Sequence, residues 1–342
     1  MHQYIDRQTL RVCDETLRGD AILRRLYSPV LETVPGLLGL ATSRRVSQIL
    51  AFLNYDNRFL AGITGTRRFA EACGIDMTES VEPSALDTPR KVFERKIRYW
   101  DLRPLPPEAD AIVCPADSRV VVGSSSSSSL VFIKGKFFEV AELLGGRPKW
   151  VQRFLTSGYA LFRLTPEKYH WTHFPVSGRV VDFYDADGVY HSCNPAALVR
   201  PITPLSKNRR VITVIDTNVE NGSNVGMVAM IEIVALMIGH IEQRYCESRY
   251  EHPQPVEPGM FVHRGCPKGL FRPGSSSVVL LFEPGRVQFA TDLVANRNRA
   301  DVNSRLSEGL GRPVVETDVQ VRSLLALPTL RNLPSTGAVS HD

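Results

Sequence analysis

The stretch "FRPGSSSVVLLFEPG" at 271–285 joins a glycine–serine turn to a dense apolar run. The run from Val278 to Phe282 contains no charged residue, and a second turn signal, Pro284-Gly285, follows it. A short apolar run bounded by turn residues is typical of a buried strand. The sequence therefore predicts a core strand here, with three serines at its start.

A second serine run, at 124–129, has a different environment. It follows Gly123, lies between two apolar runs, and is accompanied by no acid or base. Serine tracts of this kind form flexible connections between strands. We therefore predict a loop at 124–129 and look for chemistry only at 274–277.

Runs similar to the one at 278–282 recur between residues 110 and 290. They are short, rich in Val, Ile and Phe, and separated by Asp, Gly, Pro and Asn. Regular helices between them are missing, which favours a β-rich sandwich or barrel-like domain over a βαβ fold. The runs are "AIVCPADSRVVVG" at 111–123, "LVFIKGKFFEV" at 130–140, "YALFRLT" at 159–165, "RVVDFYDADGVYHS" at 179–192, "RRVITVIDT" at 209–217, "VGMVAMIEIVALMIG" at 225–239 and "SVVLLFEPGRVQF" at 277–289.

The N-terminal part of the chain has a helical pattern. Segments 14–34 and 43–63 place apolar residues at three- and four-residue intervals with Arg between them. Such helices either pack on the protein body or lie in a membrane interface. With the proline-rich stretch at 104–107 as a boundary, we predict an α+β chain: a helical region at 1–103 that could associate with a membrane, a β-rich catalytic domain at 104–327 and a disordered tail at 328–342.

Composition restricts the classes of partner. Lys and Arg number 41 against 36 Asp and Glu, so the net charge is +5. This mild excess suits a solvated surface or attraction to anionic lipid, and no basic run interleaved with aromatic residues indicates nucleic acid. The six cysteines include no CxxC pair, which argues against zinc and against a disulfide framework. We expect a cytoplasmic protein, peripheral on a membrane, because the longest apolar stretch, 225–241, is interrupted by Glu232 and the N-terminus lacks an apolar leader.

Four polar residues in the β region are candidates for catalysis. Asp117 follows an apolar run, His170 and His173 lie in "YHWTHF", and Ser275 follows Gly274. Asp117 by itself suits an Asx-turn, and the two histidines lack the further ligands that a metal needs, so we predict no metal. Together, however, an acid, a base and a serine could form a nucleophilic triad, which is recognised by roles and not by chain order.

Five motifs in the chain resemble those of phosphatidylserine decarboxylases, in the order of that family and over about residues 70–290. The resemblance implies a proenzyme that cuts itself between Gly274 and Ser275, with Ser275 becoming a covalent pyruvoyl cofactor. The fragments 1–274 and 275–342 would stay associated, and a homodimer is compatible with it. The motifs are "PADS" at 115–118, "KGKFFEVAELLG" at 134–145, "YHWTHFPVSG" at 169–178, "ALMIGHI" at 235–241 and "KGLFRPGSSSVVLLFEPG" at 268–285.

The resemblance also assigns roles to the candidate residues. Asp117 would hold His173, which would remove the proton from the Ser275 hydroxyl as it attacks the carbonyl of Gly274. The resulting ester would undergo β-elimination, and the dehydroalanine left at 275 would hydrolyse to pyruvoyl and ammonia. The pyruvoyl ketone would form a Schiff base with the substrate amine and accept the electron pair left by CO2. Either His170 or His173 would return a proton to the product.

Departures from the family pattern leave several alternatives open. Counting from Gly274 selects Ser275 for cleavage, whereas counting back from Val278 selects Ser276. The family glycine after Asp117 is Ser118 here, and Lys168 stands where the family often has Asp. The main hypothesis is conversion of phosphatidylserine to phosphatidylethanolamine and CO2 at a membrane. The alternatives are a soluble pyruvoyl-dependent amino-acid decarboxylase and a non-processing homologue that binds lipid or a partner.

Overall fold

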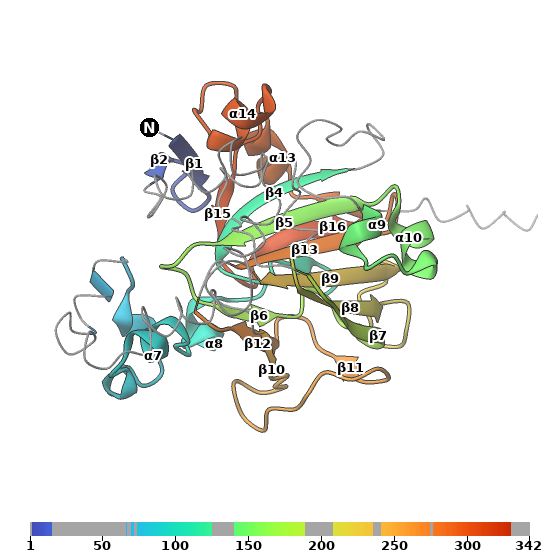
Figure 1. The fold of residues 1–342 in the computed structure, drawn as a ribbon, viewed down its shortest axis with the longest axis horizontal. Coiled ribbons are helices and arrows are strands. Elements are labelled where there is room, and N and C mark those ends of the chain that lie inside the picture. Colours follow the sequence, from blue (N-terminus) through green and yellow to red (C-terminus); the bar gives the residue numbers. More distant parts are fainter. Residues whose placement is uncertain are drawn as a thin grey trace, which may run out of the picture.

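The computed structural model describes residues 2–15, 66, 70–71, 74–124, 140–188, 208–234, 241–273 and 276–329. Within these ranges, strands dominate the order of elements and the helices between them are short. The strands form one large sheet and two small ones (Figure 1). This confirms the predicted β-rich α+β fold class.

The large sheet has ten strands, and its neighbouring strands are antiparallel except for β1 and β15, which run parallel. The order across the sheet is β11 (Phe261–Val262), β7 (Gly178–Ala186), β8 (Arg210–Asp216), β9 (Met227–Val234), β13 (Ser276–Phe282), β5 (Gly158–Leu164), β4 (Ser118–Ser124), β15 (Thr317–Val319), β1 (His2–Asp6) and β2 (Val12–Glu15).

Strand β13 is the apolar run that follows the serines, and it lies near the middle of the large sheet. All seven of its residues are buried, and β9 and β5 pair with it along its whole length. Side chains alternate between the two faces of a strand, so Val278 and Leu280 pack on one face while Val279 and Leu281 pack on the other. Because both faces of β13 are covered by other elements, its sequence is a continuous apolar run and does not alternate between apolar and polar residues.

The two small sheets cover one face of the large sheet. Phe271, Phe289 and Leu325 extend from them into the same core as Val278 and Leu280. The strand orders are β10 (Ile241–Gln243), β12 (Pro267–Phe271) and β6 (Trp171–His173) in one small sheet, and β14 (Val287–Phe289), β16 (Leu324–Pro328) and β3 (Ile112–Val113) in the other.

Helices cover the opposite face of the large sheet. Leu143, Trp150 and Phe154 pack there against Val279 and Leu281. The helices on this face that supply these side chains are α9 (Val140–Leu143) and α10 (Pro148–Phe154). The first of these helices, α9, ends before Gly145, whose φ of 65° is a left-handed conformation that glycine adopts without strain. The other helices of the described residues are η2 (Met77–Glu79), η3 (Pro83–Ala85), α7 (Pro89–Phe93), α8 (Tyr99–Leu102), α13 (Thr291–Arg297) and α14 (Arg305–Leu310).

The N-terminus differs from the predicted helical region. Residues 2–15 form the hairpin β1–β2, which extends the large sheet because Ile5 pairs with Thr317 of β15. A partner strand more than 300 residues away decides this conformation, and local spacing does not reveal it. The two helices expected at 14–34 and 43–63 lie outside the described residues, apart from Asp14 and Glu15 in β2. None of the helices within the described ranges is long and apolar enough to span a bilayer.

Glu232, which interrupts the longest apolar stretch, belongs to a buried polar cluster. The Lys268 ammonium lies 2.6 Å from a Glu232 carboxylate oxygen, and neither side chain is exposed to solvent. Lys268 also donates to Gln243 at 2.6 Å, and Thr172 donates to Glu232 at 2.6 Å. These bonds compensate the cost of burying the charges, and they link all three strands of the β10–β12–β6 sheet to β9.

Replacing Lys268 by Met should therefore destabilise the protein strongly. The substitution leaves the Glu232 carboxylate buried without its cation, which typically costs about 3–5 kcal/mol. Urea unfolding of Lys268→Met in an uncleaved chain measures this loss. The double variant Lys268→Met/Glu232→Leu should recover most of the stability, since an apolar pair needs no counter-charge. A single variant as stable as its parent would contradict the role of the pair.

Candidate active site

His173 lies at the end of β6, fully buried against β12, where it pairs with Pro267. Its Nδ1 atom is 2.8 Å from the carbonyl oxygen of Gly265, which can only accept, so Nδ1 carries the hydrogen. The lone pair of the neutral ring is therefore on Nε2, 3.0 Å from the hydroxyl oxygen of Tyr169. The structure thus fixes which nitrogen of His173 can act as a base.

Burial lowers the pKa of His173 to about 3, because the charged imidazolium loses its hydration. The negative charge of Asp117 opposes this shift but does not outweigh it. At neutral pH the ring is consequently uncharged. The uncharged ring has the lone pair that a general base needs, although its low pKa makes it a weak base, and the imidazolium that could donate a proton is scarcely populated.

Two tyrosines connect His173 to the chain around Ile97. The Tyr169 hydroxyl lies 2.8 Å from that of Tyr250, whose oxygen in turn lies 2.9 Å from the carbonyl oxygen of Ile97. Tyr99 packs edge-on against the imidazole, with ring centroids 4.8 Å apart. Hydroxyls and rings therefore restrict the orientation of His173 on several sides.

Asp117 is buried just before β4, and an arginine holds its carboxylate. Arg103 donates to both carboxylate oxygens, at 3.3 and 3.0 Å, and the backbone N–H of Val321 donates at 2.7 Å. Arg103 also forms an ion pair with Glu79 at 3.0 Å. The bonds from Arg103 and Val321 thus fix the position of the Asp117 carboxylate.

The structure brings Asp117 and His173 into one neighbourhood without a direct hydrogen bond between their side chains in the described residues. The backbone N–H of His173 donates to the carbonyl of Pro115 at 2.8 Å, so the two motifs are adjacent. The side chain of each has other partners: Arg103 for Asp117, and Tyr169 with Gly265 for His173. Asp117 therefore acts on His173 through its charge.

His170 has a different environment from His173. Its Nδ1 atom bonds the carbonyl of Lys168 at 2.8 Å, and its ring stacks on Phe93 with centroids 3.7 Å apart. Burial lowers its pKa to about 3 as well. Its Nε2 atom is buried and has no hydrogen-bond partner within the part of the chain that the structure describes. Such an atom is costly to leave unpaired, and it suits contact with a polar group.

Gly274 and Ser275 lie outside the described residues, but the chain on both sides is described. Strand β12 ends at Phe271 in a small sheet, and β13 begins at Ser276 in the centre of the large sheet. The described residues on the two sides of the candidate cleavage site thus belong to two different sheets. Ser276 and Ser277 are buried, and their hydroxyl oxygens lack hydrogen-bond partners among the described residues.

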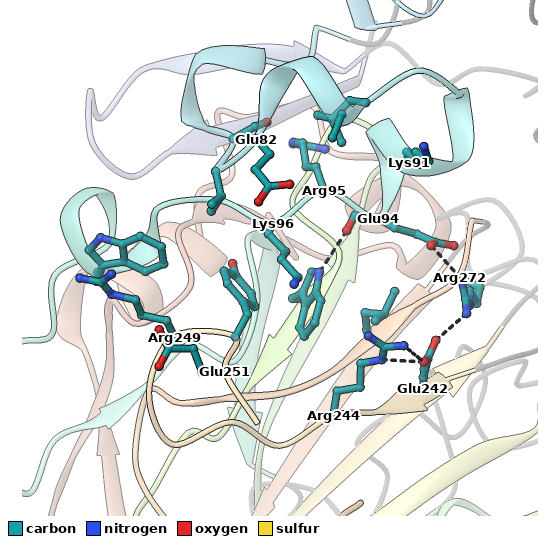
Figure 2. A pocket seen from close by; sticks show the side chains of 18 residues that line it. Glu82, Lys91, Glu94, Arg95, Lys96, Glu242, Arg244, Arg249, Glu251 and Arg272 are labelled. Atoms are coloured by element: carbon teal, nitrogen blue, oxygen red, sulfur yellow. Dashed lines mark hydrogen bonds and ion pairs between the residues drawn. The ribbon is translucent and has the colours of Figure 1, made fainter. Parts of the chain in front are cut away.

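A pocket of about 610 Å³ lies beside β6 and β12. Trp171, Tyr250 and Leu270 are among the residues that line it. Arg272, which lies three residues before Ser275, also lines it, and Figure 2 shows Arg272 between Glu94 and Glu242. A smaller cavity, of about 230 Å³, borders Asp117 and Arg103. No cluster of three or more metal-binding side chains occurs in the described ranges.

Arg103, Tyr169 and Tyr250 are site residues that sequence reasoning did not identify. Tyr169 stands within the motif "YHWTHF", next to His170, but only the fold shows that its hydroxyl reaches His173. Arg103 immediately precedes the proline-rich stretch at 104–107, and Tyr250 belongs to a segment without a motif. Their contacts depend on long-range packing, which local patterns do not carry.

The two buried histidines predict a loss of stability in acid. Their folded pKa of about 3 lies below the value of about 6.5 in an unfolded chain, so the unfolded state binds more protons between these pH values. Stability is then complete above pH 6.5 and falls as the pH drops toward 3, by up to about 1.4 kcal/mol per pH unit for each histidine. Urea unfolding of an uncleaved variant at pH 7 and pH 5 measures the slope. Replacing His170 by Gln should remove about half of the slope between pH 6.5 and 5, and an unchanged slope would contradict this assignment.

Comparison with known proteins adds to this geometry. A family model of phosphatidylserine decarboxylase matches residues 90–308, which include Asp117, both histidines and the Gly274-Ser275 pair. A phosphatidylserine decarboxylase proenzyme of Bordetella petrii is 30% identical over 323 residues, covering 91% of this chain and 98% of the relative. One of Chlamydia trachomatis serovar L2 is 33% identical over 222 residues, 64% of this chain and 68% of the relative. The phosphatidylserine decarboxylase proenzyme 2 of Oryza sativa is 33% identical over 222 residues, 64% of this chain and 33% of the relative. With a family match over more than half of its length and these relatives, the chain belongs to the phosphatidylserine decarboxylase family.

Proposed function

We propose that this protein is a self-processing carboxy-lyase that converts phosphatidylserine to phosphatidylethanolamine and CO2, using a pyruvoyl group made from its own Ser275. The observation that carries the proposal is the buried neutral His173 on β6, next to the strand that leads into Gly274-Ser275, within a family match that spans both. Its relatives are named phosphatidylserine decarboxylase proenzymes, which is consistent with self-processing.

In the cleavage step, the Ser275 hydroxyl attacks the carbonyl carbon of Gly274 and His173 takes the hydroxyl proton on Nε2. His173 returns this proton to the nitrogen of residue 275 as the amide C–N bond breaks, so that an ester and a free amine form. Loss of the Cα proton of residue 275 then expels the Gly274 carboxylate, and water replaces the nitrogen as ammonia. Asp117 stabilises the imidazolium of His173 through its charge, and Arg103 holds the Asp117 carboxylate in position.

The surroundings of the cleavage stretch fit a group that presents carbonyl oxygens. The buried hydroxyls of Ser276 and Ser277 have no other hydrogen-bond partner in the described ranges, and a hydroxyl can donate to a carbonyl oxygen. A pyruvoyl group supplies an electrophilic ketone that can accept the electron pair released with CO2. The chain's own residues would hold the substrate beside it and exclude water. The return of the proton to the product by His170 or His173 stays a prediction, and it requires the histidine to take up a proton first, since both rings are uncharged at neutral pH.

Interleaved strands support our proposal that the two fragments remain associated after cleavage. The smaller fragment, 275–342, would contribute β13 between β9 and β5, and β15 between β4 and β1. It would also contribute β16, which pairs with β3 and β14. Separating the fragments would break hydrogen bonds in two sheets and expose β13, which is fully buried. Backbone pairing thus holds them together without a covalent link.

Attachment to the surface of a membrane is a further part of the proposal. Its support is the net charge of +5 and the amphipathic spacing of residues 43–63. A cytoplasmic location and a homodimer stay predictions. Size-exclusion chromatography with light scattering tests the dimer, and sedimentation with anionic vesicles tests the attachment.

The activity is tested by supplying purified, processed protein with phosphatidylserine in mixed micelles and, separately, with free serine. We expect CO2 and phosphatidylethanolamine from the lipid, and no product from a Ser275→Ala chain. Decarboxylation of free serine but not of the lipid would replace the proposal with the soluble amino-acid decarboxylase. Absence of both activities from a chain that does not cleave itself would favour a non-processing homologue.

A further inference from the structure

Six cations line the 610 Å³ pocket, and most of them are already neutralised or held by the protein. Lys91 forms an ion pair with Asp87 at 2.8 Å. Arg244 pairs with Glu242, and Arg272 pairs with both Glu94 and Glu242, at 2.5–2.7 Å. The buried Arg95 donates to the backbone carbonyls of Val92, Glu167 and Lys168. The six are Lys91, Arg95, Lys96, Arg244, Arg249 and Arg272.

Lys96 and Arg249 are the exceptions, and we call them the cation pair. Neither has a carboxylate within 4.0 Å among the residues that the structure describes, and aromatic rings support both. The Lys96 ammonium lies 5.3 Å from the centroid of the Tyr250 ring, and the Arg249 guanidinium carbon lies 4.5 Å from that of Trp100. The two rings lie next to one another, with centroids 6.3 Å apart. Two neighbouring rings therefore each support one cation that has no carboxylate partner in the described part of the chain. Figure 2 shows Lys96 and Arg249 among the side chains that line the pocket.

The backbone at Arg249 is also in a costly conformation. Its φ is 50°, in the left-handed region, which typically costs a side-chain-bearing residue about 1 kcal/mol. The Tyr99 hydroxyl donates to its carbonyl at 3.3 Å and helps to hold it there. The fold thus keeps an exposed arginine over Trp100 at the expense of local strain.

We propose that the cation pair binds the phosphate oxygens of the substrate headgroup. The proposal rests on the function proposed above and deepens it, because it names the residues that distinguish a phospholipid from a free amino acid. A phosphodiester carries one negative charge on two oxygens and is a natural ligand for Lys and Arg side chains. Ring contacts leave the N–H groups of both cations free to donate.

The location fits the chemistry of the substrate. Tyr250, beneath Lys96, is linked through the Tyr169 hydroxyl to Nε2 of His173, and Leu270 and Arg272 of the same pocket lead toward Ser275. In phosphatidylserine, a short carbon chain separates the phosphate from the amine and the carboxylate. A phosphate on the cation pair would leave the rest of the headgroup to extend past Trp171 toward the cleavage stretch.

The carboxylates of the pocket do not cancel this charge. Glu94 and Glu242 have arginine partners, and Glu82 and Glu251 are exposed to solvent. Solvated carboxylates exert only a weak, salt-screened effect on a nearby anion. They also favour a headgroup that carries an ammonium over a simple anion such as inorganic phosphate.

Calorimetric titration of the processed protein with glycerophosphoserine, which has the headgroup but no acyl chains, tests the proposal. Lys96→Ala and Arg249→Ala should each weaken binding about tenfold, as expected for the loss of one charge-assisted contact. Lys96→Arg should keep most of the affinity, since it keeps the charge. Arg98→Ala is the matched control, because it removes one exposed cation next to the same segment but outside the pocket, and its affinity should stay close to that of the parent.

Two further ligands identify what is bound. Free serine, which lacks phosphate, should bind equally to the parent and to the double variant Lys96→Ala/Arg249→Ala. Inorganic phosphate should compete with glycerophosphoserine only weakly; if it binds as tightly, the site is one for free phosphate and the headgroup assignment is wrong. Equal affinity of the parent and the double variant for glycerophosphoserine would overturn the site.

Failure of the phosphate site can be told apart from failure of the proposed decarboxylase function. If the parent decarboxylates phosphatidylserine while the double variant shows an unchanged KM, the function stands and the cation pair fails. If the parent shows no decarboxylation but binds glycerophosphoserine through Lys96 and Arg249, the phosphate site stands and the enzymatic function fails. Self-cleavage on a denaturing gel should be the same in all of these variants, since the cation pair is not part of that step.

Discussion

Ser275→Ala is expected to leave the protein as one uncleaved chain without decarboxylase activity. Removing the hydroxyl removes both the nucleophile of cleavage and the source of the pyruvoyl group, so activity should fall by roughly a thousandfold or more. A denaturing gel of the purified protein measures the first effect: the parent should give fragments 1–274 and 275–342, and the variant a single full-length band. Release of CO2 from phosphatidylserine measures the second.

Ser276→Ala is the matched control. Ser276 is the first residue of β13, buried between Leu164 and Val234 of the neighbouring strands, and its hydroxyl has no partner among the described residues. Alanine should fit there, and cleavage should proceed at nearly the rate of the parent. Cleavage that persists in Ser275→Ala but stops in Ser276→Ala would move the cleavage site by one residue.

His173→Gln is expected to slow self-cleavage by about a hundredfold to ten-thousandfold, the usual contribution of a general base. Glutamine can still donate to the Gly265 carbonyl, so the hydrogen bond that holds the position is kept. The amide, however, cannot accept the proton of Ser275. A time course of band intensities after synthesis, for parent and variant, gives the ratio of rates.

Tyr169→Phe separates orientation from base catalysis at the same place. It keeps the ring that packs near His173 but removes the hydroxyl 3.0 Å from Nε2. We expect cleavage to slow by less than about tenfold, because one neutral hydrogen bond is lost and the base remains.

Equal cleavage rates for His173→Gln and the parent, with both proteins shown to be folded by circular dichroism, would exclude His173 as the base.

The central strand could be predicted from the sequence because its apolar run is continuous. Val278–Phe282 is covered on both faces, so its pattern needs no knowledge of neighbouring strands. The end of α9 could also be predicted from Gly145 and Gly146, because a left-handed residue at a helix end is a local requirement that glycine meets. By contrast, β1 forms only through pairing with β15, and Glu232 is compatible with the core only because Lys268 reaches it from another sheet. No local pattern shows either partner.

In the candidate site, too, local motifs could be predicted from the sequence and long-range contacts could not. The motifs containing Asp117 and His173 could be found in the sequence, and the fold brings them together through the backbone bond from His173 to Pro115. What the sequence could not show is which groups bond their side chains. Arg103, from the segment before β3, donates to the Asp117 carboxylate, and the hydroxyl of Tyr169, from the segment before β6, lies within hydrogen-bond distance of His173. Orientation of buried side chains depends on packing across elements, and motif spacing does not carry it.

Intact mass spectrometry of the small fragment of the mature protein tests the central claim most directly. The account predicts a chain that begins at residue 275 and is lighter than the unmodified 275–342 peptide by one ammonia, as a pyruvoyl group in place of the N-terminal serine requires. A fragment that begins with an unmodified serine, or a protein that contains only the intact 342-residue chain, would contradict it.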